Sequence, residues 1–174
     1  MIPASQTGTP ERQLMLLQDL GATVICSTAK YGAELVKAAK AANLKPGDLK
    51  LRIGTFGRDP WTDQERLALE EGLHLRALNN YGLSEMTGPG VAAECHLRSG
   101  MHIAEDHFLA EIVDPVSFEP VPPGTRGELV MTALTKDASP ILRYRTRDLT
   151  VLDLEPCPCG RTMARIGPIQ GRTS

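Results

Sequence analysis

The sequence predicts an α/β protein with a partial parallel α/β sandwich, followed by a small antiparallel, barrel-like β subdomain. Two patterns support this prediction. In the first half, apolar strand segments alternate with helical segments, and strands separated by helices pair in parallel. In the second half, short strand segments follow one another with prolines and glycines between them, which is typical of an antiparallel sheet or small barrel. The change of pattern places the boundary after residue 87.

The first half, residues 1–87, alternates helix and strand patterns throughout. A helix begins at the hydroxyl cap Thr9 and carries an apolar stripe that ends at Leu20. Thr62 and Glu65 have the spacing of a capping box, which starts another helix. The expected elements are a helix over 9–20, a strand over 22–26, a helix over 30–42, a strand over 49–56, a helix over 62–72 and a strand over 73–78.

The second half is predicted to be rich in β-strands. Its expected strands cover residues 91–95, 101–104, 108–113, 127–133 and 148–154. The β-rich region runs over residues 88–170, and residues 171–174 are expected to start a hinge.

The composition limits the class of protein and the partners. With 41% hydrophobic and 23% charged residues among 174, the chain is typical of a globular protein. A net charge of −2 argues against nucleic acid or an anionic membrane as a partner. No apolar run approaches the roughly 20 residues that span a bilayer, and the N-terminus lacks the pattern of a secretory signal. These observations predict a cytoplasmic protein.

Three of the four cysteines, with one histidine, form a candidate zinc site. Cys157 and Cys159 lie one residue apart, and two thiolates at that spacing can share a metal ion. Cys95 and His102, expected on two neighbouring strands, would complete four ligands. A site of three cysteines and one histidine is closed, so the zinc ion would be structural.

Other assignments of these residue types stay open. His96 and His107 are alternative ligands, although His96 would point opposite to the preceding cysteine on a strand. The two neighbouring cysteines could instead be unpaired thiols in a turn. Cys26 lies within an apolar strand segment and is predicted to be a core thiol.

Several segments resemble motifs of adenylate-forming enzymes, which are the acyl-CoA synthetases and their relatives. Tyr81–Glu85 resembles their aromatic-Gly-x-Thr/Ser-Glu motif, Tyr144–Asp148 resembles their Tyr-Arg-Thr-x-Asp motif, and Gly171-Arg172 resembles the start of their hinge motif. Three more segments are similar to one branch, the phenylacetate–CoA ligases; they are residues 57–62, 88–92 and 105–108. The segments occur in the family's order, and the resemblance covers essentially the whole chain.

This resemblance implies an enzyme that joins an aryl carboxylate to AMP from ATP and then passes the acyl group to coenzyme A. Joining two anions requires a metal ion, cationic groups and a site that fixes adenosine. By resemblance, Glu85 contacts magnesium, Ser84 bonds the phosphate and Tyr81 lays its ring on adenine. Gly82 would let the backbone approach the nucleotide. The alternatives are a solvated loop residue for Glu85 and a packed strand-end side chain for Tyr81.

The same resemblance gives Asp148 the role of accepting hydrogen bonds from both ribose hydroxyls. Its alternative is a salt bridge with one of the arginines crowded around it, which are Arg143, Arg145 and Arg147. Arg172 is expected at a phosphate, and its alternative is a mobile side chain.

A loop between a strand and a helix is a further candidate, because α/β sheets bind ligands at such positions. It consists of Gly57, Arg58, Asp59 and Pro60, and the resemblance implies adenine binding. The family typically has Gly-Ala-Glu-Pro there, so Arg58 and Asp59 depart from the pattern. An ordinary strand-to-helix turn is the alternative.

The family's phosphate loop and its C-terminal domain with a catalytic lysine have no match in the sequence. We therefore interpret the chain as an internal fragment of a longer ligase or as a truncated gene product, and expect it to be catalytically poor alone. Two other hypotheses stay open. One is a non-catalytic, zinc-stabilised domain that binds nucleotide or a protein, and the other is an adenylating enzyme with a different acyl acceptor. A homodimer is compatible with the resemblance, and the sequence does not decide it.

Overall fold

The computed structural model of the chain describes residues 8–173. Residues 1–7 and Ser174, which belong to the predicted first half and hinge, lie outside the described residues. Contacts between residues divide the chain into two compact units, and the division falls between Leu78 and Asn79. It therefore lies inside a strand and before residue 87, where the sequence pattern changes.

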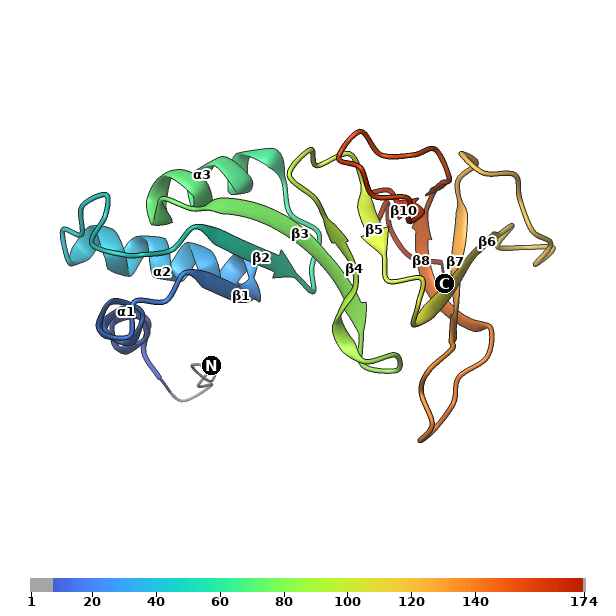
Figure 1. Ribbon diagram of the computed structural model, residues 1–174, viewed down its shortest axis with the longest axis horizontal. Helices are drawn as coiled ribbons and strands as arrows, with labels where there is room; N and C mark the ends of the chain where they lie inside the picture. Colours follow the sequence, from blue (N-terminus) through green and yellow to red (C-terminus); the bar gives the residue numbers. More distant parts are fainter. Residues whose placement is uncertain (1–7, 174) are drawn as a thin grey trace. The chain divides into compact units, whose positions relative to one another are not determined.

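The first unit consists of helices and strands in alternation, as the sequence predicts. Its elements are α1 (Pro10–Asp19), β1 (Val24–Thr28), α2 (Ala29–Ala41), β2 (Ile53–Gly57), α3 (Asp63–Leu73) and the start of β3 (Arg76–Leu83) (Figure 1). β1 and β2 pair in parallel, with Val24 opposite Ile53 and Thr28 opposite Gly57, and α2 connects them. The predicted α/β class of this half is confirmed.

Side-chain caps determine where the helices of the first unit begin. The hydroxyl of Thr9 accepts a hydrogen bond from the amide of Arg12 at 3.4 Å, at the start of α1. Thr62 and Glu65 form the predicted capping box of α3, because each side chain accepts a hydrogen bond from the other's backbone amide. Both predicted helix starts are confirmed.

Two predictions about burial in the first unit are wrong. Leu20 follows the last residue of α1 and is 65% exposed, so the buried stripe of this helix consists of Leu14 and Leu17. Cys26 is exposed rather than a core thiol. The reason is the alternation of side chains along a strand, which buries Ile25 and turns its neighbours in β1 to the other face.

Two strands of the first unit begin later than predicted. β2 begins at Ile53. Leu49 and Leu51 before it are buried without belonging to a strand, which is why their apolar pattern predicted too early a start. β3 begins at Arg76 because Leu73 still belongs to α3, and it continues to Leu83. Residues 81–83 of the first resembling motif therefore lie within a strand.

The second unit contains two groups of antiparallel strands. One continues from β3 in the order β3, β4, β5, β10, β9, and the other has the order β6, β7, β8. The new strands are β4 (Gly88–Glu94), β5 (Met101–Ile103), β6 (Phe108–Val113), β7 (Gly127–Ala133), β8 (Tyr144–Thr150), β9 (Leu152–Asp153) and β10 (Arg165–Ile166). The antiparallel prediction is confirmed.

The β-rich half differs from its prediction in closure and in its last strands. Within residues 8–173 its strands form open sheets and do not close into a barrel. The predicted strand over 148–154 is two strands, β8 and β9, and β10 was not expected. β10 is only two residues long, Arg165 and Ile166, and too short to give a period in the sequence.

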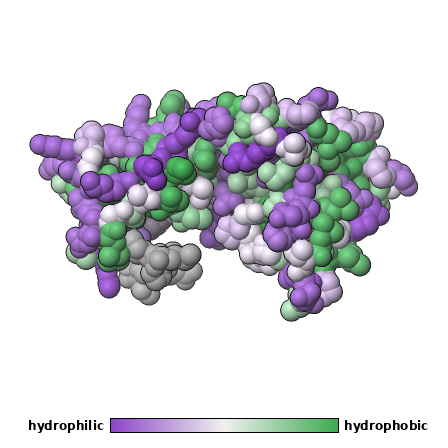
Figure 2. All heavy atoms as spheres, viewed as in Figure 1, coloured by the Kyte–Doolittle hydropathy of each residue, from purple (hydrophilic) through white to green (hydrophobic). Residues whose placement is uncertain are grey.

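The core of the second unit is built from the inner faces of its strands. Val91, Ile103, Leu129, Met131 and Ile166 are among its fully buried side chains. On the visible face of this unit, apolar and polar side chains are interspersed (Figure 2). Among the described residues, no helix has both the length and the apolar character needed to cross a membrane.

Candidate functional site

The first resembling motif lies at the hairpin between β3 and β4. Tyr81 and Gly82 belong to β3, and Ser84 and Glu85 lie in the turn, where both are exposed. The strand register shifts between Tyr81 and Gly82. A Cβ atom at residue 82 would overlap the carbonyl of Gly88 on the facing strand. Glycine is therefore required here by the close approach of the chain's own backbone.

The second motif lies in β8 and brings Asp148 to Tyr81. The Tyr81 hydroxyl donates a 2.7 Å hydrogen bond to Oδ2 of Asp148, and Nε of Arg172 lies 3.2 Å from Oδ1. The Asp148 side chain is 17% exposed. Burial, followed by the hydrogen bond to Asp148, raises the pKa of Tyr81, so its hydroxyl stays protonated and remains a donor.

The two motifs also meet at the hairpin turn. The Tyr144 hydroxyl donates a 3.1 Å hydrogen bond to Oε1 of Glu85. Nζ of Lys136 donates a 2.6 Å hydrogen bond to the backbone carbonyl of the same residue. Burial, then the hydrogen bond to Glu85, raises the pKa of Tyr144. The exposed carboxylate therefore has a protein donor and faces solvent, where hard cations such as Mg²⁺ bind.

Residues of the predicted hinge lie alongside β8. The amide of Leu149 donates to the carbonyl of Gly171 at 2.9 Å, and the amide of Thr173 donates to the carbonyl of Arg147 at 2.8 Å. Nη2 of Arg172 donates to the carbonyl of Thr146 at 2.8 Å. Together with the ion pair to Asp148, the bond to Thr146 gives the Arg172 side chain two partners in β8.

The arginines around Asp148 in the sequence mostly pair elsewhere. Arg145 makes two hydrogen bonds of 2.9 and 2.6 Å to Glu128, which is fully buried in β7. Those bonds are the main reason why the pKa of Glu128 lies below its usual value. Arg143 pairs with Glu111 at 3.1 Å. Asp148 pairs with Arg172, which was not among the expected alternatives.

Three side chains that contact the motif residues were not singled out from the sequence. Tyr144 begins the second motif, and its place in the motif is the sequence signal for its contact with Glu85. Lys136 and Glu128 carry no local sequence signal, because their partners are 51 and 17 residues away.

The predicted adenine loop belongs to the first unit, whereas the other candidate residues belong to the second. Arg58, Asp59 and Pro60 are exposed after the end of β2. Arg58 has a φ of 81°, in the left-handed region that a non-glycine residue seldom adopts. Trp61 closes the loop and packs edge-on against Phe56, with ring centroids 5.8 Å apart.

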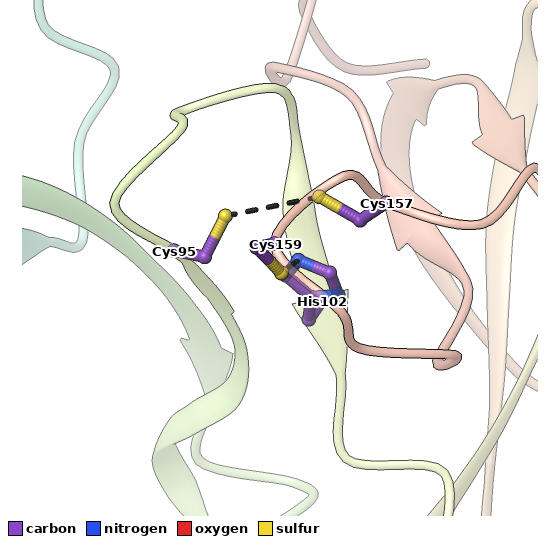
Figure 3. A group of neighbouring side chains, drawn as sticks. All are labelled: Cys95, His102, Cys157 and Cys159. Atoms are coloured by element: carbon purple, nitrogen blue, oxygen red, sulfur yellow. Dashed lines mark hydrogen bonds between the residues drawn. The ribbon is translucent and has the colours of Figure 1, made fainter.

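Cys95, His102, Cys157 and Cys159 gather in the second unit (Figure 3). Their possible ligand atoms all lie within 4.8 Å of one another. Cys95 directly follows β4, His102 lies on β5, and the other two cysteines lie on the loop after β9. Sγ of Cys95 is 3.9 Å from Sγ of Cys157, and Sγ of Cys159 is 3.6 Å from Nε2 of His102. The alternative ligands His96 and His107 are not members of this group.

Cys95, His102 and Cys157 are buried, and Cys159 is half-buried. A backbone hydrogen bond from Cys159, helped by Ser99, lowers the pKa of Cys157 to about 6, whereas burial raises the pKa of Cys95. Gly160, with a φ of 91°, closes the turn through a 3.0 Å hydrogen bond to the Cys157 carbonyl. Among the described residues, Nδ1 of His102 has no hydrogen-bond partner.

Comparison with known proteins identifies relatives over essentially the whole chain. The chain is 49% identical over 174 residues to a phenylacetate-coenzyme A ligase of Thermus thermophilus, and 47% identical over 175 residues to one of Pseudomonas putida. Each alignment covers 99% of this chain and 39% of the relative. No family model matches the chain.

A solved structure of 2-hydroxyisobutyryl-CoA ligase, in complex with 2-HIB-AMP and CoA, superposes with a TM-score of 0.87. It is 27% identical, and the match covers 97% of this chain and 40% of that protein. The chain thus spans about two-fifths of the length of the curated relatives that it matches. The chain is therefore similar, over essentially its whole length, to a part of the phenylacetate-coenzyme A ligases.

Proposed function

We propose that this chain is part of an ATP-dependent, AMP-forming ligase that activates an aryl carboxylate as an acyl-adenylate and transfers it to coenzyme A. The observation that carries the proposal is the convergence of Tyr81, Asp148 and Arg172, with Tyr144 and Glu85 at the adjoining turn. Relatives named phenylacetate-coenzyme A ligase and a neighbour solved with an acyl-AMP and CoA support the reaction class.

Asp148 is the proposed ribose ligand. An ionised carboxylate has about four lone-pair positions, and Tyr81 and Arg172 use one on each oxygen. About two positions remain, which matches the two hydroxyls of one ribose. The Tyr81 ring, anchored by its hydroxyl beside this carboxylate, is in a suitable place to stack on adenine. Arg172, now paired with Asp148, supplies positive charge for an adjoining phosphate.

Glu85 and Ser84 are proposed to act at the phosphates. Mg²⁺ prefers oxygen ligands and usually binds one or two carboxylates together with phosphate oxygens and water. Glu85 is exposed at the hairpin turn and can therefore contact a hydrated ion, while the Ser84 hydroxyl can donate to a phosphate oxygen. Magnesium would offset the repulsion between carboxylate and phosphate during adenylate formation.

Titration calorimetry of the 174-residue chain with 5′-O-[N-(phenylacetyl)sulfamoyl]adenosine, a stable analogue of an aryl acyl-adenylate, tests the nucleotide role. We expect one site per chain, and Asp148→Asn should weaken binding roughly tenfold or more because a charge-assisted hydrogen bond is lost. Glu119→Gln, an exposed carboxylate elsewhere in the second unit, is the matched control and should leave the Kd unchanged. Equal affinities for wild type and Asp148→Asn would contradict the proposal.

We also propose that the three cysteines and His102 hold a structural zinc ion. In a zinc tetrahedron with Zn–S bonds of about 2.3 Å and Zn–N bonds of about 2.05 Å, sulfurs lie about 3.8 Å apart and sulfur and nitrogen about 3.6 Å apart. The observed separations of 3.9 and 3.6 Å agree with those edges. Four protein ligands leave no open position, which is the mark of a structural site.

Metal analysis of the purified chain tests the zinc proposal. We expect one zinc ion per wild-type chain and a loss of most of it in Cys159→Ser, the half-buried ligand. Cys26→Ser, which alters an exposed thiol outside the group, should keep the full zinc content. A wild-type chain that takes up no zinc from a solution of the ion would overturn the assignment.

Two other hypotheses predict different results. A non-catalytic zinc-stabilised binding domain would bind nucleotide with an affinity insensitive to Glu85→Ala. An adenylating enzyme with a different acyl acceptor would bind the same analogue but fail to use coenzyme A, which an assay of the longer ligase with a panel of acids and acceptors would reveal.

A further inference from the structure

The two carboxylates of the proposed nucleotide site are each held by a tyrosine from the other motif. Tyr81, on β3, bonds Asp148 on β8, which is 67 positions away. Tyr144, on β8, bonds Glu85 in the turn after β3, which is 59 positions away. The two contacts therefore run in opposite directions between the same pair of segments.

We infer that Tyr81 and Tyr144 are positioning residues that hold Asp148 and Glu85 for the ribose and the magnesium–phosphate group. This inference rests on the function proposed above and extends it to the two hydroxyl groups. Ribose and phosphate are linked within one nucleotide, so the separation of the two carboxylates must match it. A reciprocal pair of hydrogen bonds between β3 and β8 keeps that separation fixed before the ligand arrives.

The Tyr81 contact has the stronger geometry. The hydrogen bond is 2.7 Å long, and both side chains are partly buried, so solvent competes little for the carboxylate. With Arg172 on the other oxygen, Asp148 is held from two sides, and its plane is fixed. Removing the hydroxyl leaves the aromatic ring in place, so the stacking role and the positioning role can be separated.

The Tyr144 contact is longer, at 3.1 Å, and its acceptor is exposed. Glu85 is nevertheless held at a second point, because Lys136 binds its backbone carbonyl at 2.6 Å. Fixing a flexible glutamate side chain in advance removes rotamer entropy that would otherwise oppose binding of the ion. We expect a smaller effect here than at Tyr81.

The test compares ATP with 2′,3′-dideoxy-ATP, which lacks both ribose hydroxyls, in Mg²⁺ buffer by titration calorimetry on the 174-residue chain. Wild type should prefer ATP by about tenfold or more. Tyr81→Phe should lose most of this preference by weakening ATP alone, because dideoxy-ATP makes no bond to Asp148. Tyr31→Phe, the tyrosine in α2, is the matched control and should keep the wild-type preference.

The possible outcomes separate this inference from the proposed function. A wild-type chain that binds both nucleotides equally, or neither, contradicts the ribose role of Asp148 and with it the inference. A wild-type preference that persists undiminished in Tyr81→Phe overturns the inference and leaves the proposed function standing. A general loss of affinity for both nucleotides in Tyr81→Phe would show a merely structural role and would also overturn it.

Tyr144→Phe tests the contact with Glu85 independently, through the effect of Mg²⁺ on the affinity for ATP. Mg²⁺ should tighten ATP binding less in Tyr144→Phe than in wild type, by a few-fold, while affinity without Mg²⁺ stays the same. An unchanged Mg²⁺ effect would remove Tyr144 from the inference.

Discussion

Two clusters of side chains in the second unit, the cysteine–histidine cluster and the carboxylate cluster around Asp148 and Glu85, are both assembled from distant parts of the sequence. They differ in whether lone pairs remain available to a ligand. Each combines side chains from strands or loops that are more than 50 residues apart in sequence. The cysteine–histidine cluster is mostly buried, and its four possible ligand atoms lie within 4.8 Å of one another. The carboxylate cluster is partly exposed, and its oxygens keep lone pairs for a ligand.

This difference indicates a division of roles within one sheet-rich unit. A closed four-ligand site can stabilise the fold but has no position for a substrate. A half-satisfied hydrogen-bond network costs stability and can bind a ligand that completes it. We therefore expect changes at the first cluster to lower the free energy of unfolding and changes at the second to lower nucleotide affinity.

Removal of the metal should have the largest effect on stability. Cys157→Ser, or stripping zinc with a chelator, should lower the free energy of unfolding of the second unit by on the order of 5 kcal/mol or more, because zinc binding is coupled to folding. Urea unfolding followed by circular dichroism measures this change. Cys26→Ser should change it by less than about 0.5 kcal/mol, as for other exposed sites. Equal free energies of unfolding with and without zinc would contradict the stabilising role proposed for the cysteine–histidine cluster.

Breaking the ion pair between Arg145 and the buried Glu128 should have the next largest effect on the free energy of unfolding. Arg145→Ala leaves the fully buried Glu128 without its main partner and should cost about 3 kcal/mol of unfolding free energy. Arg143→Ala breaks the more exposed pair with Glu111 and should cost less than about 1 kcal/mol. Similar losses in the two variants would mean that burial does not determine the value of these pairs.

Acid should weaken the second unit through the same pair. The folded-state pKa of Glu128 is below its ordinary value, chiefly because of the hydrogen bonds from Arg145, so its stabilising effect is present above about pH 5. It is lost as the pH falls through the folded-state pKa. Unfolding free energies measured from pH 6 downward should therefore fall more steeply for wild type than for Glu128→Gln. Parallel curves would contradict the assignment.

The smallest effect is expected at the exposed end of the carboxylate cluster. Glu85→Ala should weaken ATP binding by a few-fold in Mg²⁺ and leave it unchanged in a metal-free buffer, because its proposed role is to contact the ion. It should leave the unfolding free energy within about 0.5 kcal/mol of wild type, because Glu85 is exposed. Equal weakening with and without Mg²⁺ would argue against a metal contact.

The sequence predicted the elements whose signals are local. Thr9 and the Thr62–Glu65 box gave correct helix starts, and the strands β6 and β7 have the predicted bounds. The sequence also predicted the four members of the cysteine–histidine cluster, because cysteine and histidine side chains together are typical metal ligands. Signals of this kind depend on residues that are close in the chain or rare in composition.

Features that depend on the facing strand could not be predicted in this way. The exposure of Cys26 follows from which side of β1 is covered, and the open sheets follow from how strands pair. The Tyr81–Asp148 and Tyr144–Glu85 bonds require tertiary packing that brings β3 and β8, which belong to different sheets, close together. The magnesium, acyl acceptor, cellular location and homodimer stay predictions.

Hydrogen–deuterium exchange of the zinc-loaded chain, with and without the acyl-sulfamoyl adenosine, tests the contrast between the clusters most directly. The account predicts slower exchange on ligand binding in residues 81–87, 144–149 and 171–173, and unchanged exchange in residues 95–102 and 157–160. Protection at the cysteine–histidine cluster with none at the hairpin and β8 would contradict it, as would the absence of any protection.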